Sequence, residues 1–147
     1  MKQIKKPVIF LLGPTAAGKT DWAINWQNKF QFLEIISVDS VMVYKECNIG
    51  SAKPSNEILK RYPHRLINHV SVKNIFSVAN FFDAAHKLIK DIHLQDKIPL
   101  MVGGSMMYFN LLKNGISSLP SADKNLREKL RQKIINEGVE SLHEDLI

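Results

Sequence analysis

A glycine-rich octapeptide near the N-terminus constrains this chain more than any other feature. Its residues follow the phosphate-binding pattern G-x-x-x-x-G-K-[ST]: Gly13, Pro14, Thr15, Ala16, Ala17, Gly18, Lys19 and Thr20. An apolar run over residues 8–12 precedes the motif and a helix-length segment over 18–30 follows it, which is the context of a P-loop. We therefore predict a polyphosphate site in which backbone N–H groups surround the anion, Lys19 supplies positive charge and Thr20 ligates Mg²⁺.

The order of apolar runs predicts an α/β fold with a parallel sheet. Three runs are typical of buried strands, at residues 8–12, 35–38 and 98–102. Helices are favoured at 18–30, after the N-cap Ser77 and at 106–112, and a short helix from Ser55 and a strand at 66–70 are also expected. This alternation is typical of P-loop nucleotide-binding proteins, in which helices flank a doubly wound sheet.

The pattern changes beyond Gly115. Two charged helical segments follow, at about 123–136 and from about 139, and no further strand is predicted. We expect an α/β core with the P-loop at 1–115 and the start of a separate helical region at 116–147. The helical periodicity still continues at Ile147 without a stop signal, which predicts a piece of a longer protein.

Charge and composition restrict the function only weakly. The net charge of +6 suits a polyanionic partner but is also common among cytosolic proteins. Cys47 has no partner for an internal disulfide, and no apolar run reaches the roughly 20 residues of a membrane helix, so we expect a cytoplasmic protein without membrane contact. The histidines lack metal-ligand spacing and are expected at the surface or an interface, whereas Trp22 and Trp26 are expected to pack against the sheet.

Asp39 is the first candidate functional residue outside the P-loop. It follows the strand predicted at 35–38, and open α/β sheets bind ligands beyond the carboxyl ends of their strands. Its carboxylate could hold Mg²⁺ or its water, accept a proton from an attacking nucleophile, or cap the next turn with Ser40. Spacing alone leaves these three roles open.

A second strand end carries Gly103, Gly104 and Ser105. Free backbone amides and a hydroxyl at this position predict a ligand contact on the same edge of the sheet as the P-loop. A plain strand-to-helix turn would have a similar sequence.

Five segments carry a more specific signal than the P-loop alone: GPTAAGKT at 13–20, SVDSVMVYKECNIGSAKPS at 37–55, PHRLINHV at 63–70, FSVANFFDAA at 76–85 and IPLMVGGSMMYFNLLKNGISSLPSAD at 98–123. Together they resemble the successive motifs of bacterial and organellar tRNA dimethylallyltransferases. The resemblance covers essentially the whole chain but only the first half of a family member. Two positions depart from the pattern, Met42 where many members have Gln and Ser105 where Thr is usual.

The resemblance implies transfer of a dimethylallyl group from dimethylallyl diphosphate to N6 of the adenosine beside the anticodon, in tRNAs that read codons beginning with U. Asp39 would be the general base, Thr15 and Lys19 would also be catalytic, and the loop 13–20 would hold the diphosphate together with Mg²⁺. The anticodon stem-loop of tRNA would contact six residues: Asp39, Ser40, Val41, Met42, Ser105 and Arg127. The full-length protein is expected to be a monomer.

Two alternatives stay open. A P-loop kinase for a small molecule or nucleoside shares the strand, the loop, the helix and the carboxylate. A kinase usually also needs a lid that carries arginines, and the sequence shows no such lid, although Arg61 and Arg65 could be mistaken for one. The other alternative is an inactive piece that retains diphosphate binding, because the later helices of the resembled family have no counterpart in these 147 residues.

Overall fold

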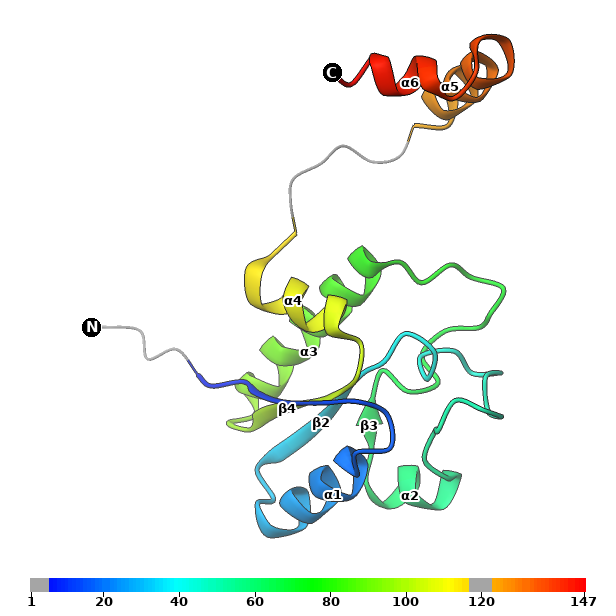
Figure 1. Cartoon of the computed structure of the whole chain (residues 1–147). Helices are drawn as coiled ribbons and strands as arrows, with labels where there is room; N and C mark the ends of the chain where they lie inside the picture. Colours follow the sequence, from blue (N-terminus) through cyan, green and yellow to red (C-terminus); the bar gives the residue numbers. More distant parts are fainter. Residues whose placement is uncertain (1–5, 117–122) are drawn as a thin grey trace, which may run out of the picture. The chain divides into compact units, whose positions relative to one another are not determined.

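The chain forms two units, Met1–Ile116 and Ser117–Ile147, and the computed structural model describes residues 6–116 and 123–147 of them (Figure 1). In its described part the first unit contains β1 (Ile9–Leu12), α1 (Lys19–Lys29), β2 (Leu33–Val38), α2 (Asn56–Arg61), β3 (His64–Arg65), α3 (Val78–Leu94), β4 (Ile98–Gly103) and α4 (Met106–Asn114). The second contains α5 (Lys124–Glu137) and α6 (Glu140–Glu144).

The strands of the first unit form one parallel sheet in the order β1-β4-β2-β3. The predicted α/β fold, a parallel sheet flanked by helices, is confirmed. Leu12 pairs with Gly103, and Gly103 pairs with Val38, so three strands end at the same level of the sheet. The segments that follow these ends therefore start side by side.

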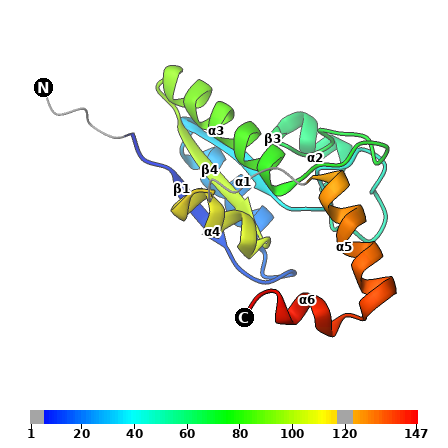
Figure 2. The same ribbon diagram turned by 90° about the horizontal axis from the view of Figure 1, so that it is seen from above.

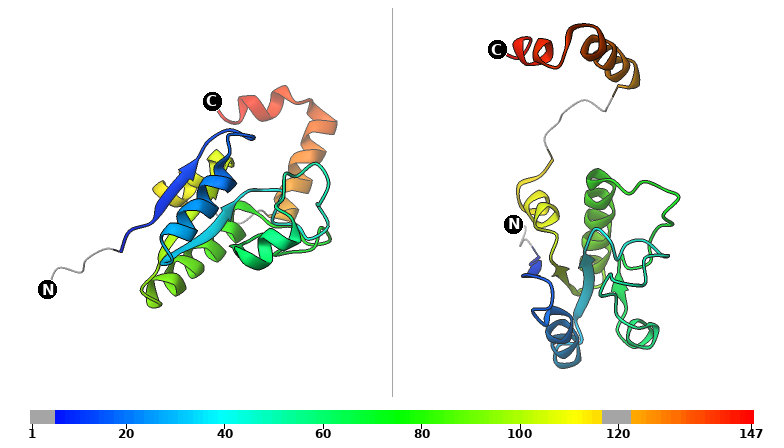
Figure 3. Two further views of the ribbon diagram at one scale, coloured as in Figure 1. Left: turned by 90° about the horizontal axis from the view of Figure 1, so that it is seen from below. Right: turned by 45° about the vertical axis from the view of Figure 1, so that its right-hand side comes forward.

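Helices cover both faces of the sheet, with α3 and α4 on one face and α1 on the other (Figures 1, 2 and 3). Successive residues of a strand point to opposite faces, so Ile36 packs toward α3 and α4, whereas Ile35 packs toward α1. On the first face, the rings of Phe81 and Tyr108 stack with their centroids 4.1 Å apart. Burial of both faces explains why β2 and β4 are almost continuously apolar.

Side-chain caps define where two helices begin. Ser77 was predicted as an N-cap, and its hydroxyl accepts a hydrogen bond from the Asn80 amide at 3.1 Å, while the Asn80 side chain accepts one from the Ser77 amide at 2.9 Å. This reciprocal capping box satisfies two backbone donors that the first turn of α3 leaves free. Ser55 caps α2 with a single hydrogen bond, which its hydroxyl accepts from the Ile58 amide at 3.3 Å.

The strand expected at residues 66–70 is wrong. The extended pairing with β2 is limited to His64–Arg65, because Leu66 and Asn68 adopt left-handed backbone conformations with φ of 68° and 55°. These conformations turn the chain away from the sheet. Val70 still pairs with Tyr44 through an isolated parallel bridge.

The expectation for the two tryptophans holds only for the second of them. Trp26 packs against the core under α1, whereas Trp22 is 57% exposed and contacts Trp26 edge to face at a centroid distance of 6.0 Å. A spacing of four residues puts both rings on one side of a helix, but only the ring further from the N-terminus of α1 reaches the sheet.

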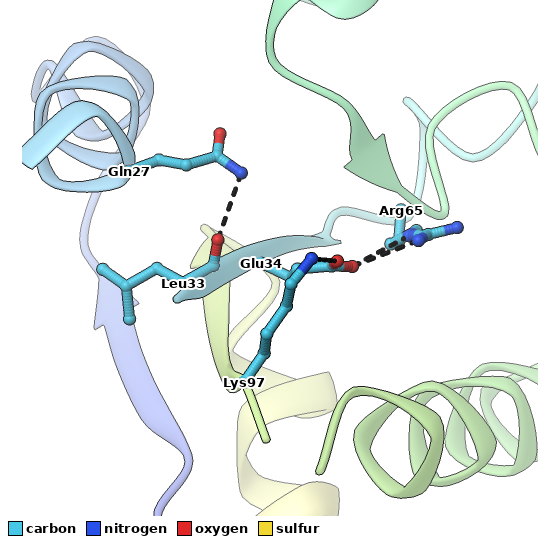
Figure 4. Close-up of polar contacts among 5 residues, drawn as sticks. All are labelled: Gln27, Leu33, Glu34, Arg65 and Lys97. Carbon is cyan, nitrogen blue, oxygen red and sulfur yellow. Dashed lines mark hydrogen bonds and ion pairs between the residues drawn. The ribbon is translucent and has the colours of Figure 1, made fainter. Parts of the chain in front are cut away.

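An ion-pair cluster joins three segments at the edge of the sheet (Figure 4). Glu34 of β2 accepts a hydrogen bond from Lys97 at 2.6 Å and one from the Arg65 guanidinium at 3.1 Å, and the Gln27 amide donates to the Leu33 carbonyl at 3.2 Å. Burial by itself raises the pKa of Glu34, but the hydrogen bonds and charges of Lys97 and Arg65 outweigh it and hold this pKa below its usual value. The Arg65 guanidinium is thereby committed to a structural contact.

We expect Glu34→Gln to destabilise the fold by about 1–2 kcal/mol at neutral pH, because it leaves the two cations without their carboxylate. Since the folded-state pKa of Glu34 is lowered, the stabilisation is complete above the unfolded value near 4.5 and is lost as the pH falls through the folded-state pKa. Denaturant titration of both proteins across the acid range measures this difference. Glu57→Gln, at an exposed glutamate of α2, is the control; an equal loss of stability at every pH would contradict the assignment.

The second unit is a pair of helices joined by polar contacts. The Asp123 carboxylate caps α5 by accepting from the Asn125 amide at 2.7 Å and the Leu126 amide at 3.2 Å. Lys133 donates to Asp145 at 2.6 Å, which connects α5 to the end of α6, and this hydrogen bond raises the pKa of Lys133. Within the described ranges, none of the helices in either unit is both long and apolar enough to cross a membrane.

Candidate functional site

A cleft of about 510 Å³ lies at the carboxyl ends of the strands in the first unit. Its lining comes from residues 15–21, from Ser37, Asp39, Val41 and Met42, from 50–52 and Pro54, from His64 and Ile67, and from 102–104. The strand ends meet here because Leu12, Gly103 and Val38 are in register. The cleft is therefore where a parallel α/β sheet is expected to bind a ligand.

The P-loop forms one wall of the cleft. Thr15, Ala16, Ala17, Gly18, Lys19 and Thr20 all line it. Ala16 and Gly18 have positive φ angles, 65° and 74°, and alternation of this kind turns successive backbone N–H groups toward one side. Helix α1 begins directly afterwards at Lys19, and the N–H groups of its first turn have no partners within the helix. The wall is therefore suited to an anion.

Two residues of the octapeptide serve the shape of the loop. Gly13 and Pro14 are outside the lining of the cleft as the described residues define it. The Pro14 carbonyl accepts a hydrogen bond from the Lys19 ammonium at 2.5 Å, so the lysine folds back over its own loop. A phosphate would compete for this ammonium, because a charged acceptor forms a stronger hydrogen bond than a carbonyl.

Asp39 follows β2 and combines two of its predicted roles. Its Oδ1 accepts from the Val41 amide at 2.8 Å and from the Met42 amide at 3.0 Å, which is the turn cap considered for it. The residue also lines the cleft. Since both hydrogen bonds go to Oδ1, the carboxylate is held in one orientation while Oδ2 takes no hydrogen bond from the described residues. A fixed carboxylate is compatible with a base or a metal ligand.

The start of α4 is connected to the Asp39 turn. Ser105 accepts from the Ser40 amide at 3.1 Å through its hydroxyl, and its own amide donates to the Val38 carbonyl at 3.3 Å. Gly103 permits this closeness, because a Cβ atom there would lie 2.0 Å from the Val38 carbonyl oxygen. The end of β4, which carries Gly103, and the end of β2, which is followed by Asp39, are thus held together.

The predicted tRNA contacts divide into three groups. Asp39, Val41 and Met42 line the cleft. Ser40 and Ser105 form the hydrogen bond beside it. Arg127 belongs to α5 in the second unit, where it is exposed.

Tyr108 adds a buried hydroxyl near the Asp39 turn. Burial raises the pKa of this phenol, and repulsion from the Asp39 carboxylate and from an ionised Tyr44 raises it further. The phenol therefore stays neutral near the carboxylate.

The cleft offers ligands for Mg²⁺ but no complete protein cage. Thr20 and Asp39 both line it and carry the hard oxygen donors that Mg²⁺ prefers. No group of three or more His, Cys, Asp or Glu side chains suited to a metal occurs within 6–116 and 123–147. These residues fit a Mg²⁺ that completes its coordination with phosphate oxygens and water.

Sequence reasoning missed a second wall of the cleft. His64 was expected at the surface or an interface, but it is only 9% exposed and lines the cleft together with Ser37 and Ser51. Burial lowers the pKa of His64, and its hydrogen bond to the Tyr62 carbonyl opposes this effect. A two-residue strand is too short to show periodicity, so only its pairing with the buried Ile35 reveals that His64 faces inward.

Comparison with known proteins gives one consistent family. The IPP transferase family model matches residues 42–147. The tRNA dimethylallyltransferase of Vesicomyosocius okutanii is 46% identical over 98% of this chain and 47% of its own length, and that of Acinetobacter baumannii is 45% identical over 96% of the chain and 45% of its own length. The chain thus spans about half the length of the curated relatives it matches.

Solved structures lead to the same group. The tRNA isopentenylpyrophosphate transferase of Bacillus halodurans matches with a TM-score of 0.73 and 35% identity, over 97% of this chain and 47% of that one. A eukaryotic dimethylallyltransferase acting on tRNA matches with a TM-score of 0.72 and 29% identity, over 90% of this chain and 32% of that one.

Proposed function

Since this chain belongs to the IPP transferase family, we propose that it carries the prenyl-donor site and the catalytic base of a tRNA dimethylallyltransferase. The reaction moves a dimethylallyl group from dimethylallyl diphosphate to N6 of the adenosine beside the anticodon of tRNA. The observation that supports this best is that the P-loop and Asp39 line one cleft. An anion-binding wall and a fixed carboxylate are the two components that the reaction requires.

The proposed chemistry is a substitution at the allylic carbon. The bond between this carbon and the diphosphate oxygen breaks, the electron pair leaves with the diphosphate, and the adenine N6 forms the new bond. Asp39 accepts the proton that N6 loses, through the Oδ2 atom that its turn cap leaves available. Thr15 belongs to the same wall and lies where the diphosphate oxygens would be held.

Charge on the leaving diphosphate is balanced by the P-loop wall. Lys19 and the backbone amides of the loop bind the diphosphate more strongly as it gains negative charge, so they lower the barrier as well as the dissociation constant. Mg²⁺, held by Thr20, would supply further positive charge to the same oxygens. The adenine enters beside Val41 and Met42, and must be flipped out of its stack for N6 to reach Asp39.

The two arginines that could have formed the lid of a kinase make other contacts in this structure. Arg65 is paired with Glu34, and the Arg61 guanidinium lies over the Tyr62 ring at 5.3 Å, so both candidate lid arginines have structural contacts. The family model that matches describes an IPP transferase, and the named relatives are tRNA dimethylallyltransferases, which transfer a prenyl group and not a phosphate.

Separate labels on the two possible donors test the proposal. We expect label from the prenyl group of dimethylallyl diphosphate to enter an anticodon stem-loop, and label from the γ-phosphate of ATP to enter neither RNA nor nucleoside. Because the chain spans about half of its relatives' length, the assay compares it with a chain extended to that length. Transfer of phosphate to a nucleoside by either form would refute the proposal.

A further inference from the structure

Two residues that line the cleft outside the P-loop each have a buried polar atom without a hydrogen-bond partner among the described residues. These atoms are His64 Nε2, from β3, and Ser51 Oγ, from the loop before α2. A buried polar atom that is left unpaired costs free energy, so a ligand, ion or water that pairs with it recovers that free energy. Because both residues line the same cleft, one ligand bound in it could pair with both atoms.

The hydrogen bond at the other ring nitrogen fixes the state of His64. Nδ1 lies 2.7 Å from the Tyr62 carbonyl oxygen, and a carbonyl only accepts, so Nδ1 carries a hydrogen. When the ring is neutral, Nε2 therefore has a lone pair and accepts. It becomes a donor to an anion only if it takes up a proton.

The wall that carries Ser51 is rigidly built. The Lys53 ammonium donates to the Tyr44 carbonyl at 2.8 Å, to Asn48 at 3.0 Å and to Asn68 at 2.8 Å. All three N–H groups of the Lys53 ammonium thereby donate to acceptors within the protein, so none is left to donate to a ligand. The loop also includes Ala52 in a left-handed conformation, φ 54°, which a side chain adopts only when its surroundings enforce it.

We propose that His64 is a proton-linked contact for the diphosphate: on binding, Nε2 takes a proton from solvent and donates it in a hydrogen bond to a phosphate oxygen, beside a hydrogen bond from Ser51. This inference rests on the proposed function. The cleft is continuous from the P-loop to His64, so an anion bound at the loop lies in the field of the ring. An anion close to an imidazole favours its charged form.

The contact would act on the reaction as well as on binding. When the bond to the allylic carbon breaks, the bridging oxygen gains the electron pair and the diphosphate becomes more negative. A protonated His64 binds this product more strongly than the ester, which is the difference that accelerates a reaction. His64 would thus assist Lys19 from another side of the leaving group.

The other charged groups around His64 set the direction of its pH dependence. Lys19 of α1 opposes protonation of the ring, whereas Asp21 of α1 and Asp39 after β2, which also line the cleft, favour it. Lys53, from the adjacent loop, is engaged by its three acceptors, and Glu34 on the neighbouring strand is engaged by Lys97 and Arg65. The bound diphosphate adds negative charge to this set. Affinity should therefore increase as the pH falls through the bound-state pKa of His64, and level off below its free-state pKa.

Calorimetric titration of the 147-residue chain with inorganic diphosphate and Mg²⁺ tests the inference. Titrations at one pH in buffers of different ionisation enthalpy measure the protons taken up on binding. We expect His64→Gln to take up fewer protons than the wild type and to bind about tenfold more weakly at mildly acid pH, with the two affinities converging at alkaline pH. His86→Gln, at an exposed histidine of α3, is the matched control and should behave as the wild type.

The outcomes separate this inference from the proposed function. If the wild type fails to bind diphosphate at any pH, both are overturned. If diphosphate binds but His64→Gln has the same affinity and proton uptake as the wild type, only the inference about His64 fails. A loss of affinity in His64→Gln that is equal at every pH also overturns it, because that result indicates a neutral acceptor. The ring signals of His64 in NMR spectra of the wild type provide a second measurement that needs no variant: they should shift toward the protonated form on addition of diphosphate.

Discussion

Lys19→Ala is expected to reduce binding of dimethylallyl diphosphate by about 3 kcal/mol, or roughly a hundredfold in Kd, and to bring it close to the detection limit. Lys19 is the lysine of the P-loop and its ammonium lies over the loop, on the Pro14 carbonyl. Without it, the diphosphate would meet only backbone dipoles and Mg²⁺. The hydrogen bond to Pro14 also disappears, so the loop itself becomes less fixed.

Calorimetry with dimethylallyl diphosphate and Mg²⁺ measures this loss. Lys29→Ala is the matched control, because it removes the same charge from the other end of α1, where the lysine lies near the Phe30 ring. Equal affinities for Lys19→Ala and Lys29→Ala would show that the loop does not hold the diphosphate, and would remove the main support for the donor site.

Asp39→Asn is expected to slow prenyl transfer by about two to four orders of magnitude while leaving donor binding nearly unchanged. Asparagine keeps an Oδ1 acceptor, so the amides of Val41 and Met42 retain their hydrogen bonds and the turn keeps its shape. The substitution removes only the negative charge and the ability to accept a proton. Asp39→Ala, in contrast, also removes the turn cap and should additionally reduce stability.

Single-turnover transfer to an anticodon stem-loop, in a chain extended to the length of the relatives, measures the chemical step. Asp83→Asn, at an exposed aspartate of α3, controls for the change in net charge. A rate for Asp39→Asn within a few-fold of the wild type would leave the turn cap as the whole role of Asp39.

Much of the first unit could be predicted from local sequence patterns. The apolar runs predicted β1, β2 and β4, of which β2 and β4 are buried on both faces while the edge strand β1 is only partly buried. The P-loop motif identifies the first strand-to-helix turn. Ser77 was found as an N-cap because capping depends on residues three apart. The convergence of the P-loop and Asp39 followed from a rule for parallel sheets, since both lie at carboxyl ends of strands.

The features that sequence reasoning missed depend on contacts between distant segments. The turn after β3 is made by Leu66 and Asn68 in left-handed conformations, and leucine gives no signal of such a conformation. His64 is buried by its pairing with β2, and Lys53 acts through acceptors at Tyr44, Asn48 and Asn68. A lysine in a polar loop normally indicates solvent exposure, so its inward role could be recognised only in three dimensions.

The hydrogen bond from the Ser40 amide to the Ser105 hydroxyl makes it possible to measure how often the end of the sheet beside Asp39 opens. The Ser40 amide is protected only while the start of α4 lies against the end of β2. Ser40 also lies in the turn in which the amides of Val41 and Met42 orient the Asp39 carboxylate. Local opening of one sheet edge requires less free energy than global unfolding, so the protein can be folded and yet have its base misplaced for part of the time. The exchange rate of a single backbone hydrogen, that of Ser40, therefore reports the fraction of molecules in which the carboxylate is in position.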